Sequence, residues 1–281
     1  YWPYQKESTM YQILAIGEVM LELAPVAAQQ KAQHLSLGYA GDTYNTSVYL
    51  ARQGVKVSYF TRLGDDPYSA QMLAAFDSEQ IGRDSIEQAA GRTPGLYMIS
   101  NDANGERHFH FWRSQSPARE MFANEQSLEL LNKALANTKE AYFSGITLAI
   151  LSPDARGAFL QSLREFRSNG GSVIFDNNYR PALWASQMEA RQAMDDALSI
   201  SDTALLTDDD AVRLWNDACP SALLERCLAA GVNEVVIKRG PNPVIMAWQI
   251  DKTQYRQKIT VAVPEVTNVV DTTAAGDSFN A

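Results

Sequence analysis

The stretch DTTAAGDSF, residues 271–279, carries the most informative pattern in the sequence. Its small side chains predict the start of a helix that leaves backbone N–H groups bare, where the helix dipole favours an anion. Asp277 lies inside this loop. A carboxylate is a poor phosphate ligand but a reasonable base for removing a proton from an attacking hydroxyl. The alternative is a capped helix in which Asp277 only complements the dipole.

A second stretch, GYAGDTYNTS at residues 38–47, places glycines where a backbone can approach a ligand closely. Asn45 follows just inside a predicted helix. The pattern therefore indicates a binding loop. It is also compatible with a plain glycine-containing turn in which Asp42 or Thr43 caps the helix.

Short apolar runs alternate with helical segments along most of the chain. This order predicts the α/β class, with a doubly wound, mostly parallel sheet. The predicted strands are residues 12–16, 55–61, 141–143, 172–175, 203–206 and 234–237, and the first predicted helices are residues 43–53 and 67–80.

The alternation breaks at Pro94. Two runs rich in β-forming residues, 95–100 and 107–112, flank the sequence DANG at residues 102–105, and Asn-Gly between such runs is a strong hairpin signal. We therefore predict a small antiparallel lid within residues 94–113. The alternative is an ordinary surface hairpin.

Composition excludes several classes of function. A net charge of -9 argues against a nucleic-acid partner, which needs clustered cations. The sequence contains no apolar run of the roughly 20 residues that span a bilayer and no export signal at its start, so we expect a cytoplasmic protein without a membrane partner. Cys219 and Cys227 support neither a disulfide framework nor a zinc site. The glycines form neither a dinucleotide fingerprint nor a Gly-Lys phosphate loop, so nucleotide binding must use another device.

The two stretches quoted above resemble the paired signatures of the ribokinase (PfkB-type) family of carbohydrate kinases, in the order and at the separation found there. The resemblance runs from Ile13 across nearly the whole chain. In detail the chain is most similar to the branch of the family that acts on 2-keto-3-deoxygluconate, an acid sugar. The stretches that carry this similarity are PGLY (94–97), FWR (111–113), SGITLAILS (144–152) and FDNNYRP (175–181).

The resemblance implies roles for individual residues. Asp277 would be the catalytic base, and Ala274, Ala275 and Gly276 would form the anion hole. The residues expected to bind the sugar are Gly41, Asp42, Asn45, Tyr97, Arg113 and Arg180. An arginine fork suits the carboxylate of an acid sugar. Phe111 departs from the family, because related enzymes often carry Tyr there.

On the nucleotide side, the stretch VVIKRG at residues 235–240 predicts a buried strand that ends in cations. The resemblance implies nucleotide binding by Lys238, Gly240 and Thr207, and contact between Asp210 and Mg²⁺ through water. Thr207 and Asp210 stand where the family usually has Asn-x-x-Glu. A simple acidic helix N-terminus is therefore an open alternative for this segment.

The family resemblance implies an enzyme that uses ATP and Mg²⁺ to phosphorylate 2-keto-3-deoxygluconate, and that forms a homo-oligomer through its lid. The alternatives are a fructokinase or another PfkB-type kinase, and a sugar- or nucleotide-sensing protein on the kinase fold. We expect one domain over residues 10–281, preceded by an extension at residues 1–9. Because Ala281 would lie within the first turns of a helix, we expect a C-terminal part of the domain to be missing.

Overall fold

The computed structural model describes residues 11–26, 34–102, 107–217, 219–251, 254–265, 267 and 272–281. The predicted extension at residues 1–9, most of the DANG turn and Asp271 lie outside these residues. Among the helices that are described, none is long and apolar enough to cross a membrane.

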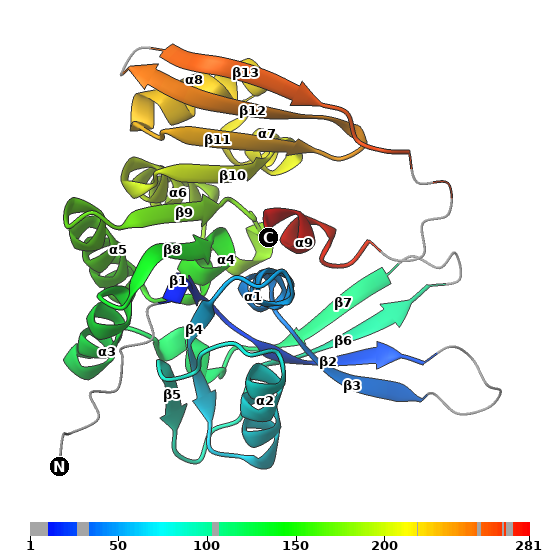
Figure 1. Ribbon diagram of the computed structural model, residues 1–281. Helices are drawn as coiled ribbons and strands as arrows, with labels where there is room; N and C mark the ends of the chain where they lie inside the picture. Colours follow the sequence, from blue (N-terminus) through cyan, green and yellow to red (C-terminus); the bar gives the residue numbers. More distant parts are fainter. Residues whose placement is uncertain are drawn as a thin grey trace.

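Within the described residues, nine strands form one sheet in the order β13-β12-β11-β10-β9-β8-β1-β4-β5 (Figure 1). The pairs from β11 to β5 are parallel, whereas β12 and β13 are added in antiparallel fashion. The α/β class and the mostly parallel sheet predicted from the alternating pattern are thus confirmed. The strands are β1 (Tyr11–Ile16), β4 (Val57–Gly64), β5 (Ile86–Ala89), β8 (Thr138–Ser144), β9 (Ser172–Asp176), β10 (Thr203–Thr207), β11 (Glu234–Arg239), β12 (Asn242–Asp251) and β13 (Gln254–Val261).

Successive residues of a strand point to opposite sides of the sheet. Both faces of this sheet are apolar for that reason, and helices cover both. In β1, Leu14 and Ile16 pack into one core, and Ile13 and Ala15 pack into the other. The first core contains side chains from α3 (Glu125–Leu135), α4 (Gly145–Ile150), α5 (Pro153–Ser168), α6 (Gln187–Ile200), α7 (Asp208–Trp215) and α8 (Pro220–Ala230). The second core contains side chains from α1 (Asp42–Arg52) and α2 (Pro67–Ser78), beside which lies α9 (Ala275–Asn280).

A second sheet forms the lid, and it is larger than the predicted hairpin. Its order in the described residues is β3-β2-β6-β7, and Figure 1 shows it projecting from the main body beside α1. The hairpin of β6 (Leu96–Asn101) and β7 (Arg107–Trp112) matches the prediction. The strands β2 (Met20–Pro25) and β3 (Leu35–Ala40) were not predicted, and Gly38 lies within β3 rather than in a turn.

The strand order places a switch point between β1 and β8, because the chain builds the sheet outward from β1 in both directions. In such sheets ligands bind at the carboxyl ends of the strands near that point. The carboxyl ends of β8, β9, β10 and β11 carry Ser144, Asp176, Thr207 and Lys238. These four side chains mark the edge where a site is expected.

Candidate active site

A polar cavity of about 370 Å³ lies at this edge of the sheet. It is lined by residues from the strand ends, the start of α1 and the start of α9. Eleven predicted site residues lie outside the anion-hole loop, and six of them line this cavity: Asp42, Arg180, Thr207, Asp210, Lys238 and Asp277. The loop residues Ala274, Ala275 and Gly276 line the same cavity, and Asn45 contacts it through Asp277.

Asp277 lies in the first turn of α9, and its Oδ2 accepts a hydrogen bond from Asn45 Nδ2 at 2.8 Å. Burial raises the pKa of the Asp277 carboxyl to about 7, and the nearby carboxylates of Asp42 and Asp176 add to the rise. The hydrogen bond from Asn45 and the charge of Lys238 oppose it. A carboxyl with a pKa near neutrality can accept a proton at physiological pH.

Asp42 begins α1, but its side chain does not cap that helix. Its Oδ2 instead accepts hydrogen bonds from Ser144 Oγ at 2.5 Å and Asn178 Nδ2 at 2.8 Å. Burial raises the pKa of Asp42, while these hydrogen bonds lower it. The preceding residue must be small, because a Cβ on Gly41 would lie 2.2 Å from the Glu18 carbonyl oxygen. Gly41 thus lets the first turn of α1 approach the end of β1.

Lys238, at the end of β11, is a nearly buried cation with two partners. Its Nζ lies 3.3 Å from Asp176 Oδ1 and donates to Asn280 Oδ1 at 2.8 Å. Asp176 is itself buried. The ammonium therefore has a fixed position at the rim of the polar cavity.

Arg180 and Asp210 form a looser pair, with 3.7 Å between Arg180 Nη1 and Asp210 Oδ2. The Arg180 side chain is 53% exposed, so its guanidinium is available to a ligand. Burial raises the pKa of Asp210, and the charge of Arg180 and the hydrogen bond from the Tyr179 amide lower it. Thr207 precedes α7 without capping it through its side chain. Asn177 instead brackets the Thr207 backbone, accepting from its N–H at 3.0 Å and donating to its carbonyl at 3.2 Å.

Four predicted sugar-binding residues, Gly41, Asn45, Tyr97 and Arg113, do not line this cavity. Tyr97 is a buried residue of the lid strand β6, and Arg113 is buried directly after the lid strand β7. The Tyr97 hydroxyl donates to Glu22, and Arg113 Nη2 donates to Glu18, which is 2% exposed. Burial raises the pKa of Tyr97, and the hydrogen bond to Glu22 and the charge of Asp277 add to the rise.

A second, mostly apolar cavity of about 620 Å³ adjoins the first. Gly240, with a φ of 55°, lies in its wall, where the left-handed backbone favours glycine. The two cavities share Thr207, Lys238, Ala275 and Gly276. The polar cavity and the apolar cavity therefore meet at Lys238 and at the start of α9. The apolar wall consists mainly of Val244, Met246, Val261, Ala262, Val263, Pro264 and Phe279.

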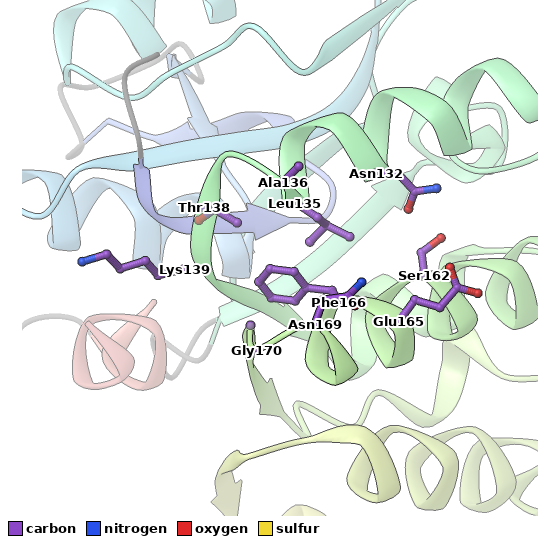
Figure 2. A pocket seen from close by; sticks show the side chains of 11 residues that line it. Asn132, Leu135, Ala136, Thr138, Lys139, Ser162, Glu165, Phe166, Asn169 and Gly170 are labelled. Carbon is purple, nitrogen blue, oxygen red and sulfur yellow. The ribbon is translucent and has the colours of Figure 1, made fainter. Parts of the chain in front are cut away.

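Figure 2 shows a third cavity, of about 710 Å³, lined by residues of α3 and α5 and by the starts of β8 and β9. Thr138, at the first position of β8, lies in its wall, whereas Ser144 ends the same strand beside Asp42. This cavity is therefore at the opposite edge of the sheet. None of the predicted site residues lines this third cavity. The polar cavity is smaller, but it holds the predicted residues and is therefore the candidate active site.

Sequence reasoning missed several polar residues of the site. Ser144, Asp176, Asn178 and Asn280 hold the carboxylates and the lysine in place, and Arg213 lines the polar cavity. The signal that could have found the first three is their position directly at or after a predicted parallel strand. Asn280 and Arg213 carry no comparable signal, because their contacts depend on how α9 and α7 dock.

Together, the doubly wound sheet, the lid and a carboxyl of raised pKa beside cations are typical of α/β enzymes that transfer a phosphoryl group to a small carbohydrate. The family model "pfkB family carbohydrate kinase" matches residues 10–281. The chain therefore belongs to the PfkB family of carbohydrate kinases.

Individual relatives agree with this assignment. The chain is 43% identical over 277 residues to the 2-dehydro-3-deoxygluconokinase of Dickeya dadantii (strain 3937), covering 97% of this chain and 86% of that protein. It is also 43% identical over 274 residues to the 2-dehydro-3-deoxygluconokinase of Escherichia coli (strain K12), covering 96% and 86%. Among solved structures, the PfkB protein from Polaromonas sp. JS666 has a TM-score of 0.82 at 24% identity, covering 96% of this chain and 86% of that one.

Proposed function

We propose that this kinase transfers the γ-phosphoryl group of ATP to the 6-hydroxyl of 2-keto-3-deoxygluconate, the 2-dehydro-3-deoxygluconate of its relatives' name. The product is 2-keto-3-deoxy-6-phosphogluconate. The observation that carries the choice of substrate is the 43% identity to two 2-dehydro-3-deoxygluconokinases along nearly the whole chain. The cationic side chains of the polar cavity support it, because this substrate is an anion.

In the proposed mechanism Asp277 accepts the proton of the 6-hydroxyl as the oxygen attacks the γ-phosphorus. The new bond joins the sugar oxygen to phosphorus, and the bond from the γ-phosphorus to the oxygen that links it to ADP breaks. The backbone N–H groups of Ala274, Ala275 and Gly276 would stabilise the negative charge on the moving group. The raised pKa of Asp277 supports this role, because a base with a pKa near the working pH transfers protons efficiently.

We place the nucleotide across the boundary of the two cavities. The apolar cavity, which Gly240 lines, suits an adenine ring, and Lys238 and Thr207 line both this cavity and the one that holds Asp277. Mg²⁺ would neutralise phosphate charge when bound. No cluster of three metal-binding side chains occurs in the described part of the chain, and the residues present still suit Mg²⁺, which needs only one or two carboxylates beside phosphate oxygens and water. Asp210 is the carboxylate that we assign to it.

We propose that Gly41, Asp42 and Asn45 position the sugar hydroxyls and that Arg180 contacts the substrate carboxylate. Arg180 is the better candidate for this contact, because its guanidinium is half exposed in the cavity. Arg113 already has a buried carboxylate partner, so its effect on the sugar would act through the lid. Tyr97 completes the proposed sugar site from the lid side.

We further propose that residues 10–281 act as one kinase domain in the cytoplasm and that two copies associate through their lids. The exposed apolar side chains of Leu37 and Trp112 support the last point. Both lie on lid strands, and an uncovered sheet of this kind is a risk for aggregation unless a partner covers it.

A coupled assay of ATP consumption tests the proposed function directly. We expect turnover with 2-keto-3-deoxygluconate to exceed turnover with fructose by at least tenfold in kcat/KM, because only the first substrate carries a carboxylate. A preference for fructose would instead favour the fructokinase alternative. Sugar binding without any ATP consumption would favour a sensing protein.

A further inference from the structure

The helix that carries Asp277 is held by polar contacts. The structure describes all six residues of α9. Three are exposed and the other three, Asp277, Ser278 and Asn280, are only partly buried, so apolar packing cannot fix the helix strongly. In its first turn, Asp277 accepts two hydrogen bonds from α1. They come from Asn45 Nδ2 to its Oδ2 at 2.8 Å and from Thr46 Oγ1 to its backbone carbonyl at 3.0 Å.

At the other end of α9, Asn280 contacts three strands of the main sheet at once. Its Oδ1 accepts from Lys238 Nζ of β11 at 2.8 Å. Its Nδ2 donates to Asp176 Oδ2 of β9 at 2.7 Å and to the Tyr142 hydroxyl of β8 at 3.1 Å. Asp176 and Tyr142 are buried, so these contacts lie in a region of low dielectric where hydrogen bonds are strong.

Only an amide satisfies all three partners. Lys238 needs an acceptor and the Asp176 carboxylate needs a donor, and an amide offers both within one planar group. Asn280 also lies three residues after Asp277, so both side chains project from the same side of the helix. Whatever fixes Asn280 therefore fixes the rotation of α9 and with it the direction of the Asp277 carboxyl.

We propose that Asn280 is a positioning residue of the phosphoryl transfer: its amide sets the rotation of α9, and hence the place of the Asp277 carboxyl, and it holds the Lys238 ammonium where the two cavities meet. The inference rests on the proposed function for its catalytic consequence. Lys238 lines both cavities, so one side chain links the proposed base to the proposed nucleotide ligand.

Two substitutions test the proposal. Asn280→Leu removes all three contacts. Asn280→Asp keeps the size of the side chain and the acceptor for Lys238 but places a carboxylate against Asp176. We expect both to lower kcat by about tenfold or more with little change in the KM for the sugar, because misplaced reacting groups lower the rate rather than the affinity. Ser278→Ala is the matched control on the same helix, because the hydrogen bond of the Ser278 hydroxyl within the described residues goes to the Ala275 carbonyl of α9 itself. This variant should keep wild-type kcat.

A second readout needs no turnover. The charged or titratable groups that affect or are affected by Asp277 are Asp42 on α1, Asp176 on β9, Lys238 on β11 and Tyr97 on the lid. Asn280→Asp adds a negative charge to this set, so the titration midpoint of Asp277, followed by NMR with ¹³C-labelled aspartate and assigned with Asp277→Asn, should rise by about half a pH unit or more. Ser278→Ala should leave it unchanged.

The outcomes separate this inference from the proposed function. Wild-type protein that fails to phosphorylate 2-keto-3-deoxygluconate would refute the proposed function, while the NMR titration would still test the role of Asn280. A raised Asp277 midpoint in Asn280→Asp, with lowered kcat wherever the wild type is active, supports the proposal. An unchanged midpoint overturns it, and so does wild-type kcat in Asn280→Leu. If Asn280→Leu does not fold, the size-matched Asn280→Asp decides alone.

Discussion

The side chains of the polar cavity show how a protein keeps a proton acceptor useful at neutral pH. Asp42 and Asp277 face one cavity, and burial raises the pKa of both. Their environments differ in one respect. Asp42 accepts from Ser144 and Asn178, whereas the Asp277 carboxyl accepts from Asn45. Asp42 is thus held by more hydrogen bonds, which supports our proposal that Asp277 is the group that exchanges a proton.

Asp277→Asn should nearly abolish phosphoryl transfer while leaving sugar binding largely intact. Only proton acceptance and local charge change, and loss of a general base costs on the order of 10²-fold or more in rate. Steady-state kinetics gives the loss of kcat, and calorimetric titration with the sugar gives the affinity. A variant that retains more than a third of wild-type turnover would contradict the assignment of the base.

The same variant should be more stable than the wild type at high pH. The raised pKa of Asp277 means that the folded state holds a proton that the unfolded chain releases near pH 4. The stability linked to this proton is present below pH 4 and is lost as the pH rises through about 7, whereas Asn cannot ionise. The gain for Asp277→Asn should therefore grow by about 2 to 3 kcal/mol between pH 5 and pH 8. Urea denaturation at both values measures it, and equal differences at the two pH values would show that the pKa is not raised.

The two arginines should respond differently to replacement by Leu. Arg180→Leu removes a charge-assisted contact worth about 1.5 to 3 kcal/mol, so the KM for 2-keto-3-deoxygluconate should rise about ten- to a hundredfold and that for fructose should scarcely change. Arg113→Leu leaves the buried Glu18 without its partner, which should destabilise the fold by about 3 to 5 kcal/mol.

Kinetics on both sugars and thermal unfolding of each variant separate these effects. Arg83→Leu is the control, because Arg83 forms an exposed surface pair with Asp77. Equal losses on both sugars for Arg180→Leu would mean that it does not read the carboxylate. An unchanged unfolding temperature for Arg113→Leu would mean that its pair with Glu18 contributes little to stability.

At the level of elements, the sequence pattern predicts the parallel strands well, because buried strands give compact apolar runs between helices. The strands around β1, β4 and β8 to β11 were found in this way. The lid strands β2 and β3 were missed, because β2 pairs with β6, which lies far along the chain, and only that pairing makes a short mixed segment such as MLELAP a strand. The antiparallel β12 and β13 were missed as well, and they carry part of the apolar cavity.

The site is subject to the same limit. Asp277 and Asp42 could be singled out from their local motifs, whereas the contact of Asp42 with Asn178 joins residues that are 136 positions apart. Such contacts follow from strand order, which local patterns do not encode. The buried pairing of Arg113 with Glu18 is a further example, because each residue alone resembles an ordinary surface charge.

The lid should hold two copies of the chain together. Leu37 and Trp112 are exposed by 43% and 57%, and they lie on the two outer strands of the lid sheet. We expect light scattering to give at least a dimer at micromolar concentration and the double variant Leu37→Lys with Trp112→Lys to give a monomer, because buried cations oppose association. Tyr68→Lys, which changes an exposed aromatic residue on α2, is the control and should remain a dimer. A wild-type monomer with full activity would refute the shared lid.

The whole molecule carries a net negative charge, and its polar cavity holds side chains of both signs. Its net charge is -9, although both proposed substrates are anions. Arg180, Arg213 and Lys238 line the polar cavity beside five aspartates, so attraction for an anion has to come from these three cations at short range and not from the total charge of the site. This arrangement allows an acidic chain to bind small anions while its overall charge disfavours nucleic acid.

The two proposed substrates should bind cooperatively, because both cavities use the start of α9. Ala275 and Gly276 line each cavity, and α9 is fixed by polar contacts to α1 and to the main sheet. A ligand in either cavity should therefore order the wall of the other, and couplings of this kind are typically about 5- to 150-fold in affinity. We expect a non-hydrolysable ATP analogue with Mg²⁺ to tighten the binding of 2-keto-3-deoxygluconate by at least about fivefold in calorimetric titrations.

Thr46→Val removes the hydrogen bond from α1 to the Asp277 carbonyl without changing a residue that lines either cavity, so it should weaken the coupling more than either single affinity. Independent binding of the two ligands in the wild type would mean that α9 does not transmit the effect.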